Sequence, residues 1–288
     1  MRVVAVIPAR LASTRLEAKL LKDLAGKSIF QRTYEQASQA KLVNQVIIAT
    51  DSDEIYKVAK KFGAQVEMTS KDHQSGSDRI AELAKKNADW DIIVNVQGDE
   101  PFINPTDIDK AIEPFINDPL LEMTSLYHLI TDPDEINNAN NVKVVTDLNG
   151  LALYFSRANI PHIRDRHSER SDGSGSTKPY SSSEKLSPRN NARSQAKTDP
   201  LDPSGSAFFG MTFKKHIGLY AYRRDTLLRL SSLPQSELEK IEKLEQLRAL
   251  ENGIKIKMLE VSSAPIGIDT EEDYQKALNL VKGKQVKR

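Results

Sequence analysis

Two stretches of the chain place charged side chains directly after apolar runs, a pattern that suits phosphate and metal chemistry. The first is VNVQGDEPFI at residues 94–103, in which the apolar run ends in Asp99 and Glu100 and a proline follows. A carboxylate at the end of a buried strand is held rigidly, and Mg²⁺ prefers hard oxygen ligands together with substrate phosphates. Asp99 is therefore a predicted magnesium ligand.

The second stretch is IPARLASTRLEAKLLKDLAGK at residues 7–27, which also begins in an apolar run. Arginine offers planar multidentate donors and lysine a point charge, so its cations and hydroxyls suit a polyphosphate. On composition alone, a solvated loop with a chance cluster of charges fits equally well. The stretch lacks the GxxxxGK[ST] pattern, so it is not a P-loop. The side chains in question are Arg10, Ser13, Thr14, Arg15 and Lys19.

The elements that would position these side chains alternate along the first half of the chain. Short β-branched runs predict strands buried on both faces of a parallel sheet, and amphipathic stretches between them predict helices. This alternation is typical of an α/β, Rossmann-like doubly wound, mostly parallel sheet, in which ligands bind beyond the carboxyl ends of the strands. The predicted strands are 3–7, 45–50 and 91–96, and the predicted helices are 28–40, 53–62 and 77–87.

The second half is more mixed and predicts a smaller antiparallel or mixed region. In a helix predicted at 236–252, Leu238, Ile241 and Ala249 share one face, and Glu245 returns to that face. An acid on an apolar stripe is costly without a partner. Glu245 is therefore a salt-bridged core residue, an interface residue or part of a polar site. The other predicted elements are strands at 122–130, 142–147, 151–156, 216–222 and 254–261 and a helix at 270–282.

The composition limits the classes of protein to which the chain can belong. Its 41 basic and 40 acidic residues nearly cancel, which argues against generic binding to nucleic acid or membrane surfaces. Cysteine is absent, so neither disulfides nor thiolate metal sites hold the fold together. The opening MRVVAVIPAR is too short for a signal peptide, and no apolar run is long enough to span a bilayer. We expect a soluble cytoplasmic protein without nucleic-acid or membrane partners.

Residues 168–206 differ from the rest of the chain. They hold eleven serines and four prolines but no Val, Ile or Phe. Such a segment cannot bury enough apolar surface to offset its ordering entropy, so we expect a disordered insertion within a folded domain. A regulatory or partner-binding loop is the less favoured interpretation.

Seven motifs in order along the chain carry a resemblance to a known family. They are IPARLASTRL with its following lysine, DHQSGSDRIAE, VNVQGDEP, LALYFSRANIP, HIGLYAYRRDTL, EKLEQLRALENG and GIDTEEDY. Together they resemble the 3-deoxy-manno-octulosonate cytidylyltransferases, over nearly the whole chain except about 167–213. The resemblance implies CTP-dependent activation of the sugar acid Kdo for lipopolysaccharide synthesis. It also implies a nucleotide-diphospho-sugar transferase fold, a homodimer and Mg²⁺, with two ions when CTP is bound.

The resemblance also implies roles for individual residues. Asp99 and Asp269 match the family's Mg²⁺ ligands, and with Arg10 and Lys19 they form the expected catalytic set. Without the resemblance, Asp269 is better interpreted as an acid at a helix N-terminus capped by Thr270. The expected nucleotide-binding residues are Ala9, Arg10, Ser13, Thr14, Arg15, Lys19, Gln74, Ser75 and Arg79. The expected Kdo-binding residues are Gln97, Arg157, Arg164, His216, Tyr220, Glu245 and Gln246.

The same resemblance suggests how the chain is organised. A single α/β nucleotidyltransferase domain is expected over 1–288. Residues 1–120 would mainly bind the nucleotide, and residues 121–262 would mainly bind the sugar and form the dimer. Taken singly, His216 is more often a packed strand residue and Arg157 a structural ion pair, so these two assignments depend on the resemblance.

The chain departs from the family at two places. Glu17 and Ala18 stand where the family has Pro-Gly; Gly permits backbone shapes that Ala resists, and Pro fixes φ. The Ser-rich segment replaces a much shorter connection. The Glu17-Ala18 change leaves open a degenerate protein that binds nucleotide or sugar without catalysis. The motifs leave open an amino-Kdo or another sugar acid as substrate, although QGDEP and EQLRALE disfavour a sialic acid.

Overall fold

One mixed sheet runs through the described part of the molecule. The computed structural model describes residues 1–11, 16–73, 75–162 and 213–285. Within these residues the main strand order is β3-β2-β1-β4-β8-β5-β9, and β6 and β7 extend from β8. The strands are β1 Val3–Ala9, β2 Gln45–Thr50, β3 Val66–Met68, β4 Ile92–Asn95, β5 Met123–Leu129, β6 Lys143–Thr146, β7 Ala152–Ser156, β8 Lys214–Arg223 and β9 Ile256–Glu260.

The predicted fold class is confirmed. β1 runs parallel to both β2 and β4, and β2 runs parallel to β3. β8 enters this sheet antiparallel to β4 and β5, while β9 is parallel to β5. The mostly parallel sheet thus carries an antiparallel strand, β8, between β4 and β5, and β6 and β7 pair antiparallel beside it.

Helices cover both faces of this sheet, as a doubly wound fold requires. Successive residues of a strand point to opposite faces, so Val3, Ala5 and Ile7 pack with α1, α2 and α4, whereas Val4 and Val6 pack with α3, α7 and α9. The helices are α1 Ile29–Ala37, α2 Asp53–Lys61, α3 Gly76–Lys86, α4 Pro105–Ile112, α5 Pro114–Asn117, α6 Pro133–Asn137, α7 Arg224–Ser232, α8 Glu237–Glu242, α9 Gln246–Glu251 and α10 Glu271–Gln285, with a 3₁₀ turn η1 at Lys19–Leu21.

The prediction of one continuous helix over 236–252 is wrong. The structure has α8 and α9 instead, separated at Lys243, which adopts the left-handed conformation with φ 54°. The phase of the 3.6-residue repeat is lost at this residue, so Ile241 lies 70% exposed rather than on a shared apolar face. Glu245 becomes the N-cap residue of α9. The strand β3 and the helices α4, α5, α6 and α7 were also absent from the predicted elements.

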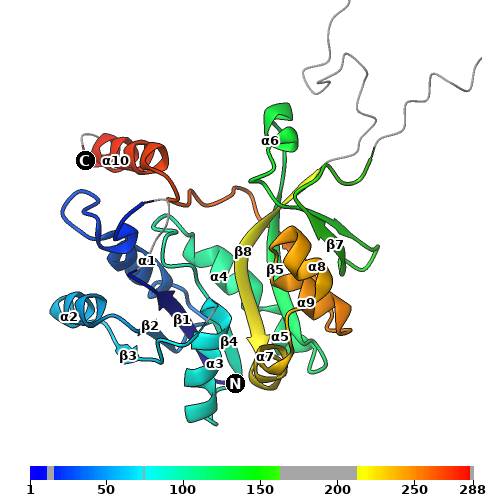
Figure 1. Ribbon diagram of the computed structural model, residues 1–288, viewed down its shortest axis with the longest axis horizontal. Coiled ribbons are helices and arrows are strands. Elements are labelled where there is room, and N and C mark those ends of the chain that lie inside the picture. Colours follow the sequence, from blue (N-terminus) through cyan, green and yellow to red (C-terminus); the bar gives the residue numbers. More distant parts are fainter. Residues whose placement is uncertain (12–15, 74, 163–212, 286–288) are drawn as a thin grey trace, which may run out of the picture.

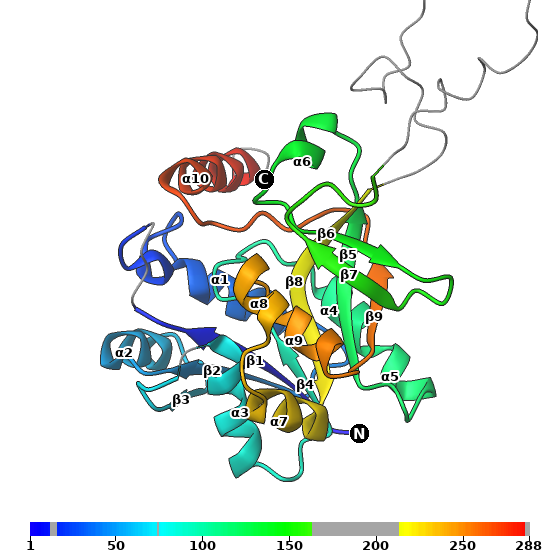
Figure 2. The same cartoon turned by 45° about the vertical axis from the view of Figure 1, so that its right-hand side comes forward.

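The C-terminal helix returns to the start of the chain. Ile268, Ala277 and Val281 form a separate apolar cluster with Leu24 and Ile29. Both views show α10 beside the loop that follows β1 (Figures 1 and 2). This contact brings the segment before α10 to the carboxyl ends of β1 and β4. In the described part of the chain, no helix is both long and apolar enough to cross a bilayer.

Candidate active site

Gly98, which follows β4, allows the carboxyl ends of β1 and β4 to approach each other closely. A Cβ on Gly98 would lie 3.3 Å from the carbonyl oxygen of Pro8 and 3.4 Å from Leu20. The Gly98 carbonyl accepts a 3.0 Å hydrogen bond from the Thr33 hydroxyl. The QGDE turn is therefore held against the start of the first loop, which places Asp99 next to that loop.

Lys19 joins the two predicted metal ligands. Its Nζ lies 2.5 Å from Oδ2 of Asp99 and 2.8 Å from Oδ1 of Asp269. Only 12% of the Lys19 side chain is exposed. Burial lowers the pKa of Lys19, but the Asp99 charge and the hydrogen bonds to both carboxylates outweigh it, so the pKa lies above its usual value. The ammonium is charged and bridges two segments that are 170 residues apart in sequence.

Asp269 sits at a junction that the backbone also fixes. The Ile268 N–H donates to the Asp99 carbonyl at 3.0 Å. The next residue, Thr270, caps α10: its hydroxyl accepts from the Asp273 N–H and donates to the Asp273 carboxylate. Thr270 thus acts as the helix cap, as the simpler interpretation held, while the Asp269 carboxylate turns towards Lys19.

The Asp99–Asp269 pair fits a divalent cation of the Mg²⁺ type. One oxygen of each carboxylate accepts a hydrogen bond from Lys19 Nζ. The distance between these two oxygens therefore cannot exceed the sum of the two hydrogen-bond lengths. Mg²⁺ is usually held by one or two carboxylates plus substrate phosphates. No cluster of three His, Cys, Asp or Glu that suits a metal occurs among the residues described. Phosphate and water oxygens would therefore complete the coordination.

Glu100 adds a third carboxyl group beside this pair. Burial raises its pKa, and the charges of Asp99 and Asp269 raise it further, to about 8. Its buried Oε2 has no hydrogen-bond partner among the described residues. Glu100 is therefore largely protonated near neutral pH, and its unpartnered oxygen is a polar group that a bound ligand or water can satisfy.

A cavity of about 130 Å³ lies beside the same strand ends. It contains four of the predicted sugar-binding side chains: Gln97, Tyr220, Glu245 and Gln246. The buried Gln246 Nε2 has no partner among the described residues. Burial raises the pKa of Glu245 although a hydrogen bond from Ser77 opposes this shift. The remaining lining residues are Gly76, Ser77, Asn95, Met123, Tyr222 and Leu230.

Six of these lining residues were not predicted from the sequence, and a signal exists for three polar ones among them, Asn95, Tyr222 and Ser77. Asn95 and Tyr222 stand two positions from Gln97 and Tyr220, and residues i and i+2 of a strand face the same side. Ser77 belongs to the same DHQSGSDR motif as Ser75. Strand periodicity applied to the predicted sugar-binding residues would have identified the first two.

Two predicted sugar-binding residues lie outside the cavity lining. His216 Nε2 lies 3.0 Å from Ser125 Oγ, and burial lowers the pKa of His216 to about 3, so its imidazole is neutral. The Arg157 guanidinium donates to the carbonyls of Glu242 and Ala139 at 3.0 and 3.1 Å. In this structure Arg157 ties α8 to the loop before β6, and His216 packs within the sheet.

The predicted nucleotide-binding residues that the structure describes lie along the edge formed by β1, β2 and α3. Ala9 ends β1, and the exposed Arg10 follows it. Ser75 caps α3. Arg79 is fully buried, and its Nη2 donates to Asp51 at 2.8 Å, so it can act on a nucleotide only through the loop that it holds. The predicted residues Ser13, Thr14, Arg15, Gln74 and Arg164 and the segment 168–206 lie outside the described residues.

Comparison with known proteins places this geometry among the cytidylyltransferases. A family model described as cytidylyltransferase matches residues 4–256. The chain is 43% identical over 282 residues to the 3-deoxy-manno-octulosonate cytidylyltransferase of Geobacter sulfurreducens, covering 98% of this chain and 100% of that one. It is 43% identical over 284 residues to the enzyme of the same name from Flavobacterium johnsoniae, covering 98% and 99%.

Solved structures agree with these sequence relatives. A CMP:2-keto-3-deoxy-manno-octonic acid synthetase complexed with CTP superposes with a TM-score of 0.79 at 35% identity, covering 99% of this chain and 100% of that chain. A glucose-1-phosphate thymidylyltransferase candidate from Bacillus anthracis shares only the fold, with a TM-score of 0.60 at 14% identity, covering 97% of this chain and 95% of that chain.

Proposed function

Because the chain belongs to the 3-deoxy-manno-octulosonate cytidylyltransferase family, we propose that it transfers CMP from CTP to 3-deoxy-D-manno-octulosonate (Kdo). The products are CMP-Kdo and pyrophosphate, and the pathway served is lipopolysaccharide synthesis. The observation that carries this proposal is the Lys19–Asp99–Asp269 cluster beside a polar cavity. It brings a cation, a pair of carboxylates and a polar cavity together at one edge of the sheet, which supports binding of phosphate, metal and sugar there.

The anomeric hydroxyl of Kdo attacks the α-phosphorus of CTP, and pyrophosphate leaves. Such transfers depend mainly on positioning and electrostatic stabilisation. Arg10 and Lys19 bind the triphosphate oxygens, and no side chain is assigned as an obligatory base. Asp99 and Asp269 would hold Mg²⁺, which supplies charge neutralisation at the phosphates and lowers the pKa of the attacking hydroxyl when bound.

The cavity side chains suit a polyhydroxylated acid. Gln97 and Gln246 each offer an amide donor and an acceptor, and Tyr220 and Glu245 add further polar atoms. A sugar hydroxyl that enters the cavity gives a partner to the buried Gln246 Nε2, which has none among the residues that the structure describes. His216 is neutral, so it contributes no charge to binding the Kdo carboxylate.

Lys19 must leave the carboxylate pair for this chemistry to proceed. The same ammonium cannot bridge Asp99 and Asp269 while a divalent cation occupies the space between them. Triphosphate oxygens compete with the carboxylates for Lys19, so CTP and the metal favour each other's binding. The lysine keeps two like charges together until the substrate arrives.

The enzyme is proposed to act in the cytoplasm as a homodimer. Two exposed leucines support a contact through the β6–β7 hairpin: Leu148 in its turn and Leu153 in β7, 106% and 61% exposed. Among the described residues, β7 itself pairs only with β6, although Leu151, just before it, forms an isolated bridge with Lys257, so the edge beyond this bridge is available to a second copy.

Pyrophosphate release with CTP and a panel of sugar acids tests the proposed function. Kdo is expected to support turnover, while 8-amino-Kdo and N-acetylneuraminic acid serve as competing candidates. UTP and GTP test the nucleotide. Preferred turnover with another acid, or equal turnover with UTP, would replace the substrate assignment; absence of turnover with every acid would favour a non-catalytic binding protein.

A further inference from the structure

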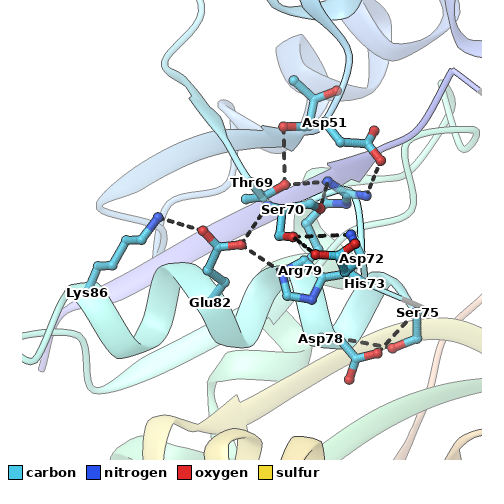
Figure 3. A network of polar contacts seen from close by, with 11 residues as sticks. Asp51, Thr69, Ser70, Asp72, His73, Ser75, Asp78, Arg79, Glu82 and Lys86 are labelled. Atoms are coloured by element: carbon cyan, nitrogen blue, oxygen red, sulfur yellow. Dashed lines mark hydrogen bonds and ion pairs between the residues drawn. The ribbon is translucent and has the colours of Figure 1, made fainter.

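Residues 69–75 link β3 to α3; the structure describes 69–73 and Ser75 of this loop, and a polar network lies beneath residues 69–73 (Figure 3). The loop follows the carboxyl end of a parallel strand, where ligands of doubly wound sheets bind. A Cβ on Gly76, the first residue of α3, would lie 3.3 Å from the Pro8 side chain, and Gly76 and Ser77 line the cavity. The loop therefore ends where the phosphate-binding loop and the cavity meet.

The first end of the loop is fixed to the sheet. The Thr69 N–H and hydroxyl both donate to the Thr50 carbonyl, at 2.8 and 3.1 Å. The fully buried Arg79 binds Thr69 Oγ1 through Nη1 and Asp51 through Nη2. Arg79 lies on α3, so this contact holds the end of β2, the start of the loop and the helix in one arrangement.

The second end is fixed by the helix itself. The Ser75 hydroxyl accepts from the Asp78 N–H, and the Asp78 carboxylate accepts from the Ser75 N–H, at 3.1 and 3.0 Å. This reciprocal pair is a capping box. Both ends of the loop are therefore set by contacts that the sheet and the helix need for their own stability.

The middle of the loop is held by the Glu82 carboxylate, in addition to the hydrogen bonds between Ser70 and Asp72. Glu82 Oε2 accepts the Ser70 N–H at 2.9 Å and lies 2.7 Å from His73 Nε2. The carboxylate only accepts, so His73 Nε2 carries the hydrogen. Ser70, Lys71 and Asp72 are exposed, so Glu82 supports a stretch that has little packing of its own.

The other oxygen of Glu82 faces outward. Lys86 Nζ lies 2.6 Å from Oε1, and 53% of the Lys86 side chain is exposed. Lys86 thus contacts the same carboxylate without touching the loop. It offers a matched control for the contact made by His73.

We propose that His73, held by Glu82, is a positioning residue that pre-organises residues 69–73 for CTP. This inference rests on the proposed function. A loop already fixed in its binding conformation avoids the entropy cost of being ordered by the ligand. Loss of the His73–Glu82 contact therefore weakens CTP binding, while the cavity keeps its lining, to which none of residues 69–73 belongs.

Two substitutions separate the hydrogen bond from the side chain that makes it. In His73→Gln the amide nitrogen reaches the position of Nε2 and keeps the donor to Glu82. In His73→Asn the amide reaches only the position of Nδ1, and the contact with Glu82 is lost. Lys86→Met removes the outer ion pair alone.

The measurements are the Michaelis constants for CTP and Kdo, kcat, the melting temperature and CTP binding without sugar by calorimetry. His73→Asn should raise the CTP KM and Kd about tenfold, the size of one lost charge-assisted hydrogen bond. His73→Gln and Lys86→Met should stay within about threefold of the wild type, and the Kdo KM should stay within about twofold in all three.

Equal CTP constants in His73→Asn and His73→Gln would overturn the inference, as would equal increases in the CTP and Kdo KM. If His73→Asn does not fold, the Gln variant decides: a wild-type CTP Kd supports the inference, and a tenfold weaker one overturns it. Failure of the proposed function gives a different result, because the wild-type protein itself would then release no pyrophosphate from CTP.

Discussion

At the scale of single residues, the site depends on three charged groups that come from distant parts of the chain. Lys19, Asp99 and Asp269 carry one positive and two negative charges within hydrogen-bonding distance. Such a cluster is stable only while a cation lies between the carboxylates. In this structure the cation is the lysine, and in the proposed reaction it is a metal ion.

Replacing either carboxylate by its amide should abolish most of the activity. Asp99→Asn and Asp269→Asn each keep the side-chain shape but remove a negative metal ligand, so kcat should fall about a thousandfold. Pyrophosphate release across a Mg²⁺ titration measures this effect, and circular dichroism checks the fold. Near-normal kcat in either variant would remove that residue from the metal site.

Replacing the lysine should have opposite effects on two ligands. Lys19→Met removes a phosphate ligand, so kcat/KM for CTP should fall about a hundredfold. It also removes the internal competitor, so Mn²⁺ should bind the nucleotide-free protein about tenfold more tightly. Electron paramagnetic resonance of free Mn²⁺ measures the second effect without catalysis.

Lys22→Met is the control for this variant. Lys22 lies on the same loop and pairs with Glu271 at 3.1 Å rather than with the carboxylate pair. Its Mn²⁺ affinity should match the wild type. Weaker or unchanged Mn²⁺ binding in Lys19→Met would show that the lysine does not compete with the metal.

At the scale of elements, the first loop contains an alanine in a conformation that favours glycine. Ala18 precedes η1 with φ 45° and ψ 34°. The resemblance implies Gly at this position, and glycine adopts such a conformation without the strain that alanine meets. Ala18 thus keeps Lys19 in place at a cost in backbone strain.

Ala18→Gly should therefore stabilise the protein by about 0.5–1 kcal/mol. Relief of the left-handed strain, about 1–2 kcal/mol, outweighs the added freedom of the unfolded chain, about 0.4–1 kcal/mol. Urea unfolding measures the change. Ala81→Gly, in the interior of α3, should instead destabilise by about 1 kcal/mol. A loss of stability in Ala18→Gly would contradict the inference that the left-handed backbone of Ala18 is strained.

The network beneath residues 69–73 should make stability depend on pH. Partial burial raises the pKa of Glu82, but hydrogen bonds from Lys86, Ser70 and His73 lower it to about 2, below the usual 4.5. A depressed carboxyl pKa stabilises the fold above about 4.5, and this contribution is lost as pH falls towards about 2.

Glu82→Gln should therefore cost about 1–2 kcal/mol at pH 7, after allowance for solvent screening. The difference in the free energy of unfolding between the variant and the wild type should decrease as pH falls from 4.5 to 3. Urea unfolding at pH 7, 4.5 and 3 follows this difference. A difference that does not change over this range would show that the charge of Glu82 is not its cause.

At the scale of the whole molecule, the β6–β7 hairpin presents exposed leucines and the edge of β7 beyond the Leu151–Lys257 bridge. Leu153→Lys should place a charge in the proposed dimer contact and convert the dimer to a monomer, because burying an unpaired charge is costly. Light scattering after gel filtration measures the mass. Leu120→Lys is the control, since Leu120 is 86% exposed but follows α5 rather than the hairpin. A monomeric wild type, or a dimer unchanged by Leu153→Lys, would contradict this assembly.

Local pattern was sufficient for most of the fold. The β-branched runs that became β1, β2 and β4, and the capped repeat that became α2, needed only neighbouring residues to be recognised. The strand end at Asp99 followed from the same pattern. The family motifs then assigned roles to individual residues. The break between α8 and α9 at Lys243 could not be recognised, because a 3.6-residue repeat fitted to the whole stretch assumes one continuous helix.

The sequence by itself determined the sheet, the residue types at its carboxyl edge and the family, because these depend on short-range periodicity and on ordered motifs. The tertiary structure alone decided which charges meet. Lys19 reaches Asp269 only because α10 packs on the first loop. Arg79 lies inside the molecule and Arg10 outside, although both were predicted to bind nucleotide. Pairing between distant residues depends on how the elements pack, and a linear pattern does not encode those distances.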